Sequence, residues 1–285
     1  MDHNIQEELV KQVANQVRKL NNLQEKNIKH QVDQIYTQLE SFFWLQRSLK
    51  LQGNLPPLRG WPVSPDFLLL LHRWITKHKP KVIVETGSGA STLVIADALR
   101  QNNQGKLFSF EHLEKYGNQT WQTLVDENLT GWVDLRVGEL VDWQHDHLNP
   151  VDAEKKSRWY LRDFEGIQQI ELLVVDGPPG GTCKYARYPA VPALHGRMSA
   201  GAEVWMDDAN RQDEIDVCER WAELYGFDLE FIPLEKGLAC LKRAKQEVSA
   251  STLPVAASVD TNTYSDYDEW HLGLDFSLPE DRQTS

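Results

Sequence analysis

Short apolar runs alternate with helical stretches throughout residues 81–243, and this alternation restricts the possible folds more than any other feature. The apolar runs suited to strands lie at 81–86, 106–111, 132–137, 170–176, 202–207, 227–232 and 237–242. The predicted helices between them lie at about 91–102, 114–128, 188–199 and 211–225. Strands that are apolar throughout and alternate with helices are typical of a parallel sheet covered on both faces. The sequence therefore predicts an α/β fold with a seven-stranded, mostly parallel sheet.

The last two predicted strands are joined only by residues 233–236. A parallel crossover needs about a dozen residues, so these strands are expected to form an antiparallel hairpin. Ahead of the first strand, a short helix is predicted to follow Ser64, begin at Pro65 and end before Pro80.

The first 52 residues contain neither Gly nor Pro but fourteen Asn or Gln, and they predict one long helix. From Ile28 to Phe42 the apolar residues recur at alternating steps of four and three, which is the heptad spacing of a coiled coil. The stripe continues less regularly upstream, from Leu9 to Leu20. Two interpretations stay open. The helix forms a coiled coil that makes the protein a homodimer or a higher homo-oligomer, or it is an amphipathic arm folded onto its own domain.

The charge balance excludes one class of partner. The chain has 42 acidic and 30 basic residues, a net charge of -12, and lacks the basic footprint that binding to nucleic acid requires.

No stretch approaches the roughly 18 apolar residues of a transmembrane helix, and the first residues lack the layout of a signal peptide. The three cysteines form no C-x-x-C pair, so neither a disulfide framework nor a thiolate metal site is indicated. We therefore expect a cytoplasmic protein.

Composition divides the chain into three parts. Residues 1–52 form the helical segment, residues 53–243 the α/β domain, and residues 244–285 a tail rich in Ser, Thr, Asp and Ala. The tail has eight acidic and two basic residues and is predicted to be mobile. The alternative is that the apolar residues between Trp270 and Phe276 dock as an edge strand or lid.

A glycine-containing turn follows the first predicted strand, in the sequence Glu-Thr-Gly-Ser-Gly-Ala-Ser-Thr at 85–92. Glycines let the backbone turn sharply and approach a ligand, and the next helix presents unpaired N–H groups. A dinucleotide fingerprint would place a third glycine where Thr92 stands, which weakens a nicotinamide interpretation. The acidic Glu85 is unfavourable beside a pyrophosphate but suits the cationic methionine end of S-adenosylmethionine.

Acidic residues end the second and third predicted strands. Glu111 ends the second strand, where a carboxylate can accept hydrogen bonds from both hydroxyls of a ribose; the alternative is an ordinary solvent-facing carboxylate. Glu139 follows the third strand, where it or the adjacent backbone can meet an adenine amino group; a surface role is equally compatible.

Aspartates end the next two strands. Asp176 precedes Gly-Pro-Pro-Gly-Gly, and Asp207 and Asp208 end the fifth strand. The carboxyl ends of parallel strands meet at one edge of an open α/β sheet, where such folds bind ligands. The three carboxylates are therefore expected to converge. The alternative is that Asp176 stabilises a turn and that Asp207 or Asp208 caps the following helix.

These motifs resemble those of the class I S-adenosylmethionine-dependent methyltransferases. The resemblance covers residues 64–243 and is nearest to bacterial members with E-x-G-x-G, here Glu85 to Gly89, and D-G-P-P-G, here Asp176 to Gly180. It implies a Rossmann-like sheet and S-adenosylmethionine as cofactor. The cofactor-binding residues that it implies are Glu85, Gly87, Ser88, Gly89, Ser91, Thr92, Glu111, His112, Glu139 and Asp176.

Resemblance to the metal-dependent O-methyltransferases of catechol type implies a further site. There, aspartates after the fourth and fifth strands hold a divalent cation, and the corresponding residues here are Asp176, Asp207 and Asp208. Oxygen ligands suit Mg²⁺. Asp176 and Asp207 are also the candidate catalytic bases.

The acceptor is expected to be a hydroxyl on a small polar molecule or glycan. The insertion 143–169 carries Trp159 and Tyr160, which form either an aromatic lid over an acceptor or a surface helix anchored by Trp159. Lys184 and Arg187 either bind an anionic group or lie on a solvent-facing loop. Two other functions stay open: a dinucleotide-dependent oxidoreductase or epimerase, and a non-catalytic coiled-coil assembly protein.

Overall fold

The computed structural model of the chain describes residues 3–160 and 164–243. The predicted acidic tail, 244–285, lies outside the described residues. None of the described helices combines the length and the apolarity needed to cross a lipid bilayer.

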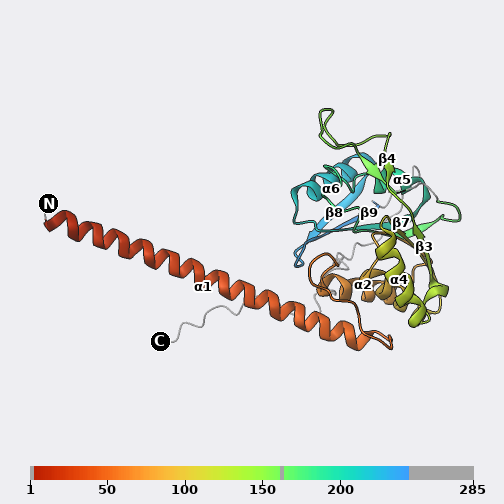
Figure 1. Ribbon diagram of the computed structural model, residues 1–285, viewed down its shortest axis with the longest axis horizontal. Helices are drawn as coiled ribbons and strands as arrows, with labels where there is room; N and C mark the ends of the chain where they lie inside the picture. The colour runs from red at the N-terminus through yellow and green to blue at the C-terminus, as the bar shows by residue number, and fades with distance from the viewer. Residues whose placement is uncertain (1–2, 161–163, 244–285) are drawn as a thin grey trace, which may run out of the picture. The chain divides into compact units, whose positions relative to one another are not determined.

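A seven-stranded sheet in the order β3-β2-β1-β6-β7-β9-β8 forms the centre of the fold (Figure 1). Its strands are β1 (Val82–Thr86), β2 (Lys106–Glu111), β3 (Val133–Val137), β6 (Ile170–Val175), β7 (Met198–Asp207), β8 (Phe227–Ile232) and β9 (Leu238–Arg243). The central strands are parallel, whereas β9 runs antiparallel to both β7 and β8. The predicted Rossmann-like sheet with an antiparallel last strand is therefore confirmed.

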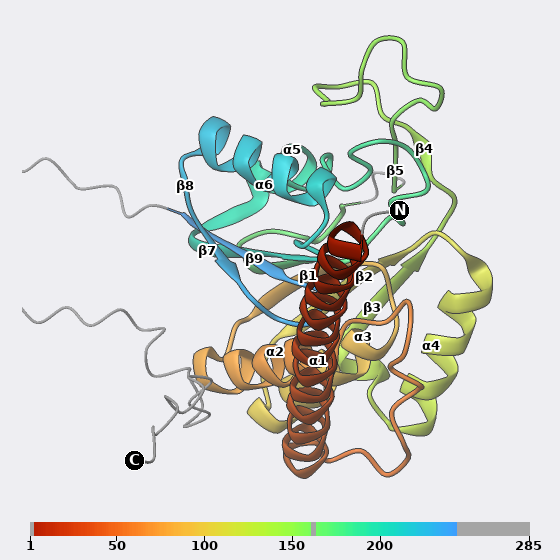
Figure 2. The same cartoon turned by 90° about the vertical axis from the view of Figure 1, so that its left-hand side faces the viewer.

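Helices lie on both faces of the sheet, with α5 and α6 on one side and α2 and α3 on the other (Figure 2). Their bounds are α1 (His3–Ser48), α2 (Pro65–His78), α3 (Ala90–Asn102), α4 (Glu114–Asp126), α5 (Ala190–Leu194) and α6 (Gln212–Tyr225). Two short 3₁₀ helices are η1 (Thr130–Trp132) and η2 (His195–Arg197). The insertion between β3 and β6 contains two antiparallel strands of two residues each, β4 (Val141–Asp142) and β5 (Arg158–Trp159). Its described residues form these strands and not the surface helix considered above.

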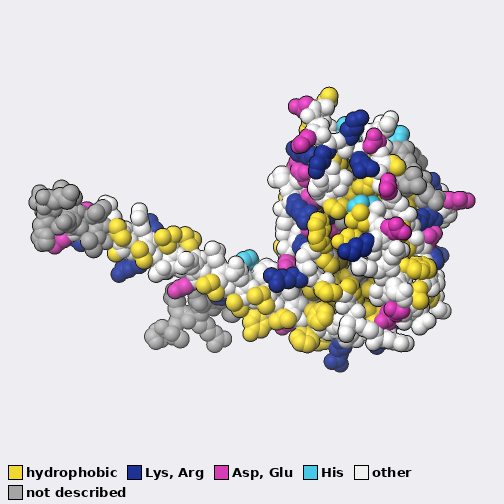
Figure 3. Space-filling view, in the orientation of Figure 1, with side chains coloured by type: hydrophobic (Ala, Val, Ile, Leu, Met, Phe, Trp, Pro, Cys, Tyr) yellow, Lys and Arg dark blue, Asp and Glu magenta, His cyan; other side chains and the backbone are white. Residues whose placement is uncertain are grey.

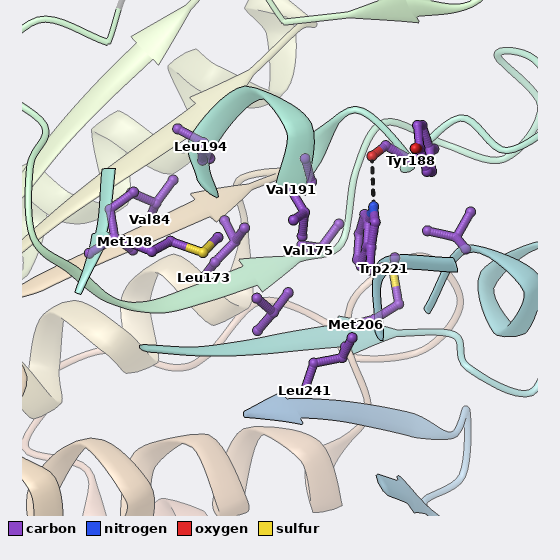
Figure 4. Packing of buried hydrophobic residues seen from close by; sticks show 14 of the residues in the cluster. Val84, Leu173, Val175, Tyr188, Val191, Leu194, Met198, Met206, Trp221 and Leu241 are labelled. Atoms are coloured by element: carbon purple, nitrogen blue, oxygen red, sulfur yellow. Dashed lines mark hydrogen bonds between the residues drawn. The ribbon is translucent and has the colours of Figure 1, made fainter. Parts of the chain in front are cut away.

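The predicted helix at 188–199 is wrong in extent. The α-helix is only five residues long, and β7 already begins at Met198. Pro192 has no N–H to donate to the carbonyl of Tyr188 one turn earlier. That carbonyl instead accepts a hydrogen bond of 3.0 Å from the Trp221 indole of α6, which fixes this segment by tertiary contact (Figure 4).

The core between the sheet and α6 explains why β6 is apolar from Leu172 to Val175. Leu173 and Val175 of β6, Met206 of β7 and Val217 and Trp221 of α6 are all buried in one cluster (Figure 4). The alternate residues of β6 point to the other face of the sheet and are also fully buried. Burial on both faces holds the carboxyl end of β6, and with it Asp176, in a fixed position.

Helix α1 is continuous over 46 residues. Near its end Ser41, Leu45 and Leu49 are buried, whereas every side chain from Lys11 to Asp33 is exposed. An arm folded onto its own domain therefore describes only the last turns of this helix. The coiled coil stays a prediction.

Candidate active site

The turn between β1 and α3 is the centre of the site. Gly87 has a φ of 92°, and its N–H donates to the carbonyl of Phe110 in β2 at 2.9 Å. A Cβ atom at Gly87 would lie 3.1 Å from the carbonyl oxygen of Asp176. Thr86 also donates its hydroxyl to the carbonyl of Gly177 at 3.0 Å. The turn therefore requires glycine for its dihedral angle and for its close approach to the end of β6.

Glu85 lies beneath this turn and is fully buried. Its Oε2 accepts hydrogen bonds from the hydroxyls of Thr92, at 2.6 Å, and Ser109, at 2.7 Å. Its Oε1 has no hydrogen-bond partner among the described residues. Burial raises the pKa of Glu85 to about 7. The described part of the protein thus holds a carboxyl group with a free acceptor at the first strand end and places no cation against it.

This raised pKa predicts a pH-dependent effect of Glu85→Gln on stability. The folded-state pKa of about 7 exceeds the ordinary glutamate value of 4.5, so the folded protein loses stability as the pH rises between these values. Ionised Glu85 then costs about 3 kcal/mol above pH 7. We expect Glu85→Gln to stabilise the protein by up to that amount at pH 8 and by little at pH 5. Urea unfolding at both pH values measures the difference, and an effect of equal size at both would contradict the assignment.

Glu111 fixes the other side of the turn. One carboxylate oxygen accepts from the backbone N–H of Ser88, at 3.1 Å, and the other from those of His112 and Leu113, at 2.7 and 2.8 Å. Burial opposes ionisation of Glu111, but these hydrogen bonds and His112 together hold its pKa below the ordinary value. Glu111 is therefore an ionised carboxylate at the end of β2, beside the Gly87 turn.

The three aspartates converge as the sequence predicts. One carboxylate oxygen from each of Asp176, Asp207 and Asp208 lies within 4.8 Å of the other two. They follow β6 and β7, whose carboxyl ends are adjacent in the sheet.

The buried guanidinium of Arg187 lies against these carboxylates. It donates to Asp208 Oδ2 at 2.8 Å, to Asp176 Oδ1 at 3.3 Å and to the carbonyl of Asp207 at 2.7 Å. Glu214 of α6 adds a fourth carboxylate, 3.9 Å from Nε. A divalent cation does not fit this arrangement. A cation between these carboxylates would face a permanently charged guanidinium, which already donates hydrogen bonds to Asp176 and Asp208.

Two of the aspartates have strongly perturbed acidity. Both carboxylate oxygens of Asp207 are buried and accept no hydrogen bond from the part of the chain that the structure describes, and burial followed by the charge of Asp208 raises the pKa of Asp207 to about 6. Burial, followed by the charge of Asp207, raises the pKa of Asp176 well above its ordinary value. The side chain of Asp176 is 16% exposed, compared with 0% for residue Asp207 as a whole. Asp176 is therefore the more accessible of the two groups.

Tyr160 brings an aromatic side chain to the same strand ends. It is buried, and within residues 3–160 and 164–243 its hydroxyl has no hydrogen-bond partner. A Cβ atom at Gly177 would collide with that hydroxyl, so Tyr160 lies directly against the turn after β6. Its ring packs edge-on against His112, with centroids 6.2 Å apart. The insertion thus reaches the site through Tyr160.

The other predicted residues differ in their surroundings. Trp159 is 1% exposed and packs in the core, so it offers no ring surface to a ligand. Lys184 is a surface residue with its ammonium over the ring of Tyr185, whereas Arg187 is committed to the carboxylates. Ser91 is buried in the first turn of α3, and Glu139 is exposed beyond β3.

Sequence reasoning missed Ser109 and Glu214. Ser109 pairs with Glu85 in the parallel register of β1 and β2, so aligning the two strands by their apolar residues could have placed it there. Glu214 lies in the first turn of α6, three residues after Arg211, and its contact with Arg187 has no signal in the sequence.

Comparison with known proteins agrees with this arrangement. Residues 84–209, which span the turn, Glu111, Asp176 and Asp207, match a family model described as a methyltransferase domain. These residues form a methyltransferase domain. No curated protein matches the chain in sequence.

Solved structures of methyltransferases resemble the methyltransferase domain in fold. An SAH-bound methyltransferase from Podospora anserina is 16% identical, with 72% of this chain and 86% of that chain covered and a TM-score of 0.50. An O-methyltransferase from Bacillus cereus in complex with SAH is also 16% identical, with 73% and 90% covered and a TM-score of 0.48. A methyltransferase from Geobacter sulfurreducens is 15% identical, with 62% and 78% covered and a TM-score of 0.47.

Proposed function

We propose that this methyltransferase transfers a methyl group from S-adenosylmethionine to a hydroxyl of a small polar molecule or glycan in the cytoplasm. The observation that carries the proposal is a glycine turn beside two buried carboxyl groups whose pKa values are shifted in opposite directions. Glu111 is held ionised by backbone donors, whereas Glu85 has a free acceptor and a raised pKa. This pair suits a ligand with a ribose at one end and a cation at the other.

Each end of the cofactor has a stated partner in this proposal. The ribose hydroxyls donate to Glu111, where they displace the hydroxyl of Ser88 that now donates to Oε2 at 3.2 Å. Glu85 Oε1 accepts from the methionine ammonium group, which favours the ionised form of Glu85 and makes the cofactor affinity rise with pH near 7. The turn and its surroundings complete the cofactor site through Gly87, Ser88, Gly89, Ser91, Thr92, His112 and Glu139.

The proposed reaction is an in-line displacement. A lone pair of the acceptor oxygen forms the new O–C bond while the S–C bond breaks, its electron pair stays on sulfur and S-adenosylhomocysteine leaves. The hydroxyl proton goes to Asp176, with Asp207 behind it as the coupled partner. The enzyme acts mainly by aligning donor and acceptor.

The surroundings favour a neutral acceptor. The cluster places four carboxyl groups around Arg187 and its neighbour Arg211, so no cationic side chain in it is left for an anionic substrate. The unpartnered hydroxyl of Tyr160 can donate to an acceptor oxygen beside Gly177. A polyhydroxylated molecule such as a glycan matches a site of this polarity.

Calorimetric titration with S-adenosylhomocysteine and with NAD tests the cofactor. We expect S-adenosylhomocysteine alone to bind. Binding of NAD alone would instead support an oxidoreductase or epimerase, and binding of neither would support a non-catalytic assembly protein. Methyl transfer to a panel of hydroxyl-bearing and amine-bearing small molecules then tests the acceptor class.

The variant Asp176→Asn tests the proposed base. We expect turnover to fall about 100-fold or more, because a positioned base contributes 10²–10⁴-fold, with little change in cofactor affinity. Turnover of the unchanged enzyme should rise as the pH rises through the pKa of Asp176, which burial raises well above its ordinary value. Full turnover of Asp176→Asn at unchanged cofactor affinity would contradict the role.

A further inference from the structure

Helix α1 carries an apolar stripe that the described part of the chain leaves uncovered. Its members are Val13, Val17, Leu20, Ile28, Val32, Ile35 and Leu39, which are between 43% and 60% exposed. Figure 3 shows hydrophobic side chains uncovered along this helix. Most helices in proteins owe their stability to packing of an amphipathic face, and from Lys11 to Asp33 this face has no partner among the described residues.

The spacing of the stripe is that of a helix that packs along its length against another helix. Steps of four and three join Val13 to Leu20, and steps of four, three and four join Ile28 to Leu39. Between these blocks, two steps of four pass through Gln24. Such an added step locally unwinds a supercoil without moving the stripe to another face. The two heptad blocks therefore form one continuous seam.

Charge is absent from this seam. At 100° per residue, the seven apolar residues lie within a sector of about 120°. The charged side chains from Lys11 to Glu40, nine in all with His30, lie outside that sector. The polar residues within it include Asn21, Gln24 and Gln31, whose amides both donate and accept hydrogen bonds. An amide can bond to the same side chain of an identical helix, so the seam is complementary to itself and buries no unpaired charge.

The seam is also long enough for a stable contact. Residues 13–39 form about 40 Å of helix at 1.5 Å per residue. Two such helices packed along that length bury on the order of 1,000 Å², which meets the minimum expected of a biological interface. Beyond the seam, α1 packs on its own domain through Ser41 and Leu45, which are buried, whereas Tyr36 and Phe43 stay exposed. The contact with the domain and a contact along the seam can therefore form at the same time.

We propose that the α1 seam, residues 13–39, is a self-association surface occupied by α1 of a second copy of this chain. The proposal is independent of the methyl-transfer reaction, since none of the proposed site residues lies on α1. Pairing couples two or more methyltransferase domains through their N-terminal helices.

The mass of the full-length protein in solution tests the proposal. We expect sedimentation equilibrium at about 1 to 100 μM to give two or more times 32.8 kDa. The double variant Ile28→Asp/Ile35→Asp places two charges in the seam and is expected to give the mass of a single chain. The matched control Lys26→Asp/His30→Asp places two aspartates on nearby turns outside the seam and should stay associated.

Two further measurements separate the possible failures. Tryptophan near-ultraviolet circular dichroism should be unchanged in the double variant, which shows that the α/β domain is folded. Helix content should fall with the unpairing of α1. A single-chain mass for the unchanged protein at 100 μM would overturn the proposal. Association that survives Ile28→Asp/Ile35→Asp would also overturn it, because the contact would then lie elsewhere.

Discussion

Replacement of Arg187 by Met is expected to destabilise the protein by about 3–5 kcal/mol at neutral pH, the usual cost of removing one partner from a buried charged group. The guanidinium is buried, and it neutralises Asp176 and Asp208 through direct hydrogen bonds. Met keeps an unbranched side chain where the stem of Arg187 lies, so the loss would come mainly from the missing charge. Urea unfolding at pH 7.5 measures it.

The pH dependence of Arg187→Met distinguishes this cause from a packing defect. Without the arginine, the nearby carboxyls have still higher folded pKa values, so the variant is penalised most where the unfolded carboxylates are ionised. The loss should therefore shrink as the pH falls towards 4. Lys184→Met, three residues away at the surface, is the control and should change stability little. A loss for Arg187→Met that is below about 1 kcal/mol or independent of pH would contradict the charge argument.

The variant Glu111→Gln is expected to weaken S-adenosylhomocysteine binding about 10- to 100-fold. Hydrogen bonds to a charged group contribute about 1.5–3 kcal/mol each, and the amide of Gln replaces one accepting oxygen by a donor. The amide nitrogen would also face backbone N–H groups that now donate to Glu111. Calorimetric titration measures the affinity.

A neighbouring glutamate provides the control for Glu111→Gln. Glu114 is exposed in the first turn of α4, and Glu114→Gln should leave the affinity unchanged. If Glu111→Gln also left the affinity unchanged, the assignment of ribose binding to Glu111 would be contradicted. Glu111 would then have only the structural role of holding the turn at Ser88.

Strand identity and strand-end chemistry were predictable because both depend on local sequence. Apolar runs marked all seven strands of the sheet, and the short link at 233–236 predicted the antiparallel hairpin. Since parallel strands share one carboxyl edge, the convergence of Asp176, Asp207 and Asp208 also followed. Where local signals conflicted, as at Pro192, the prediction was wrong: the helix there is cut short by a missing donor and a tertiary bond from Trp221.

The sequence by itself determined the layers, the glycine turn and the carboxylates at the strand ends. Only the tertiary structure decided what those carboxylates face. Arg187, which the sequence left between anion binding and solvent, is placed against them by the turn after β6, and Glu214 comes to it from α6. The free energy of a buried charge depends on every charge within a few ångströms, including those far away in the sequence, so no local pattern encodes it.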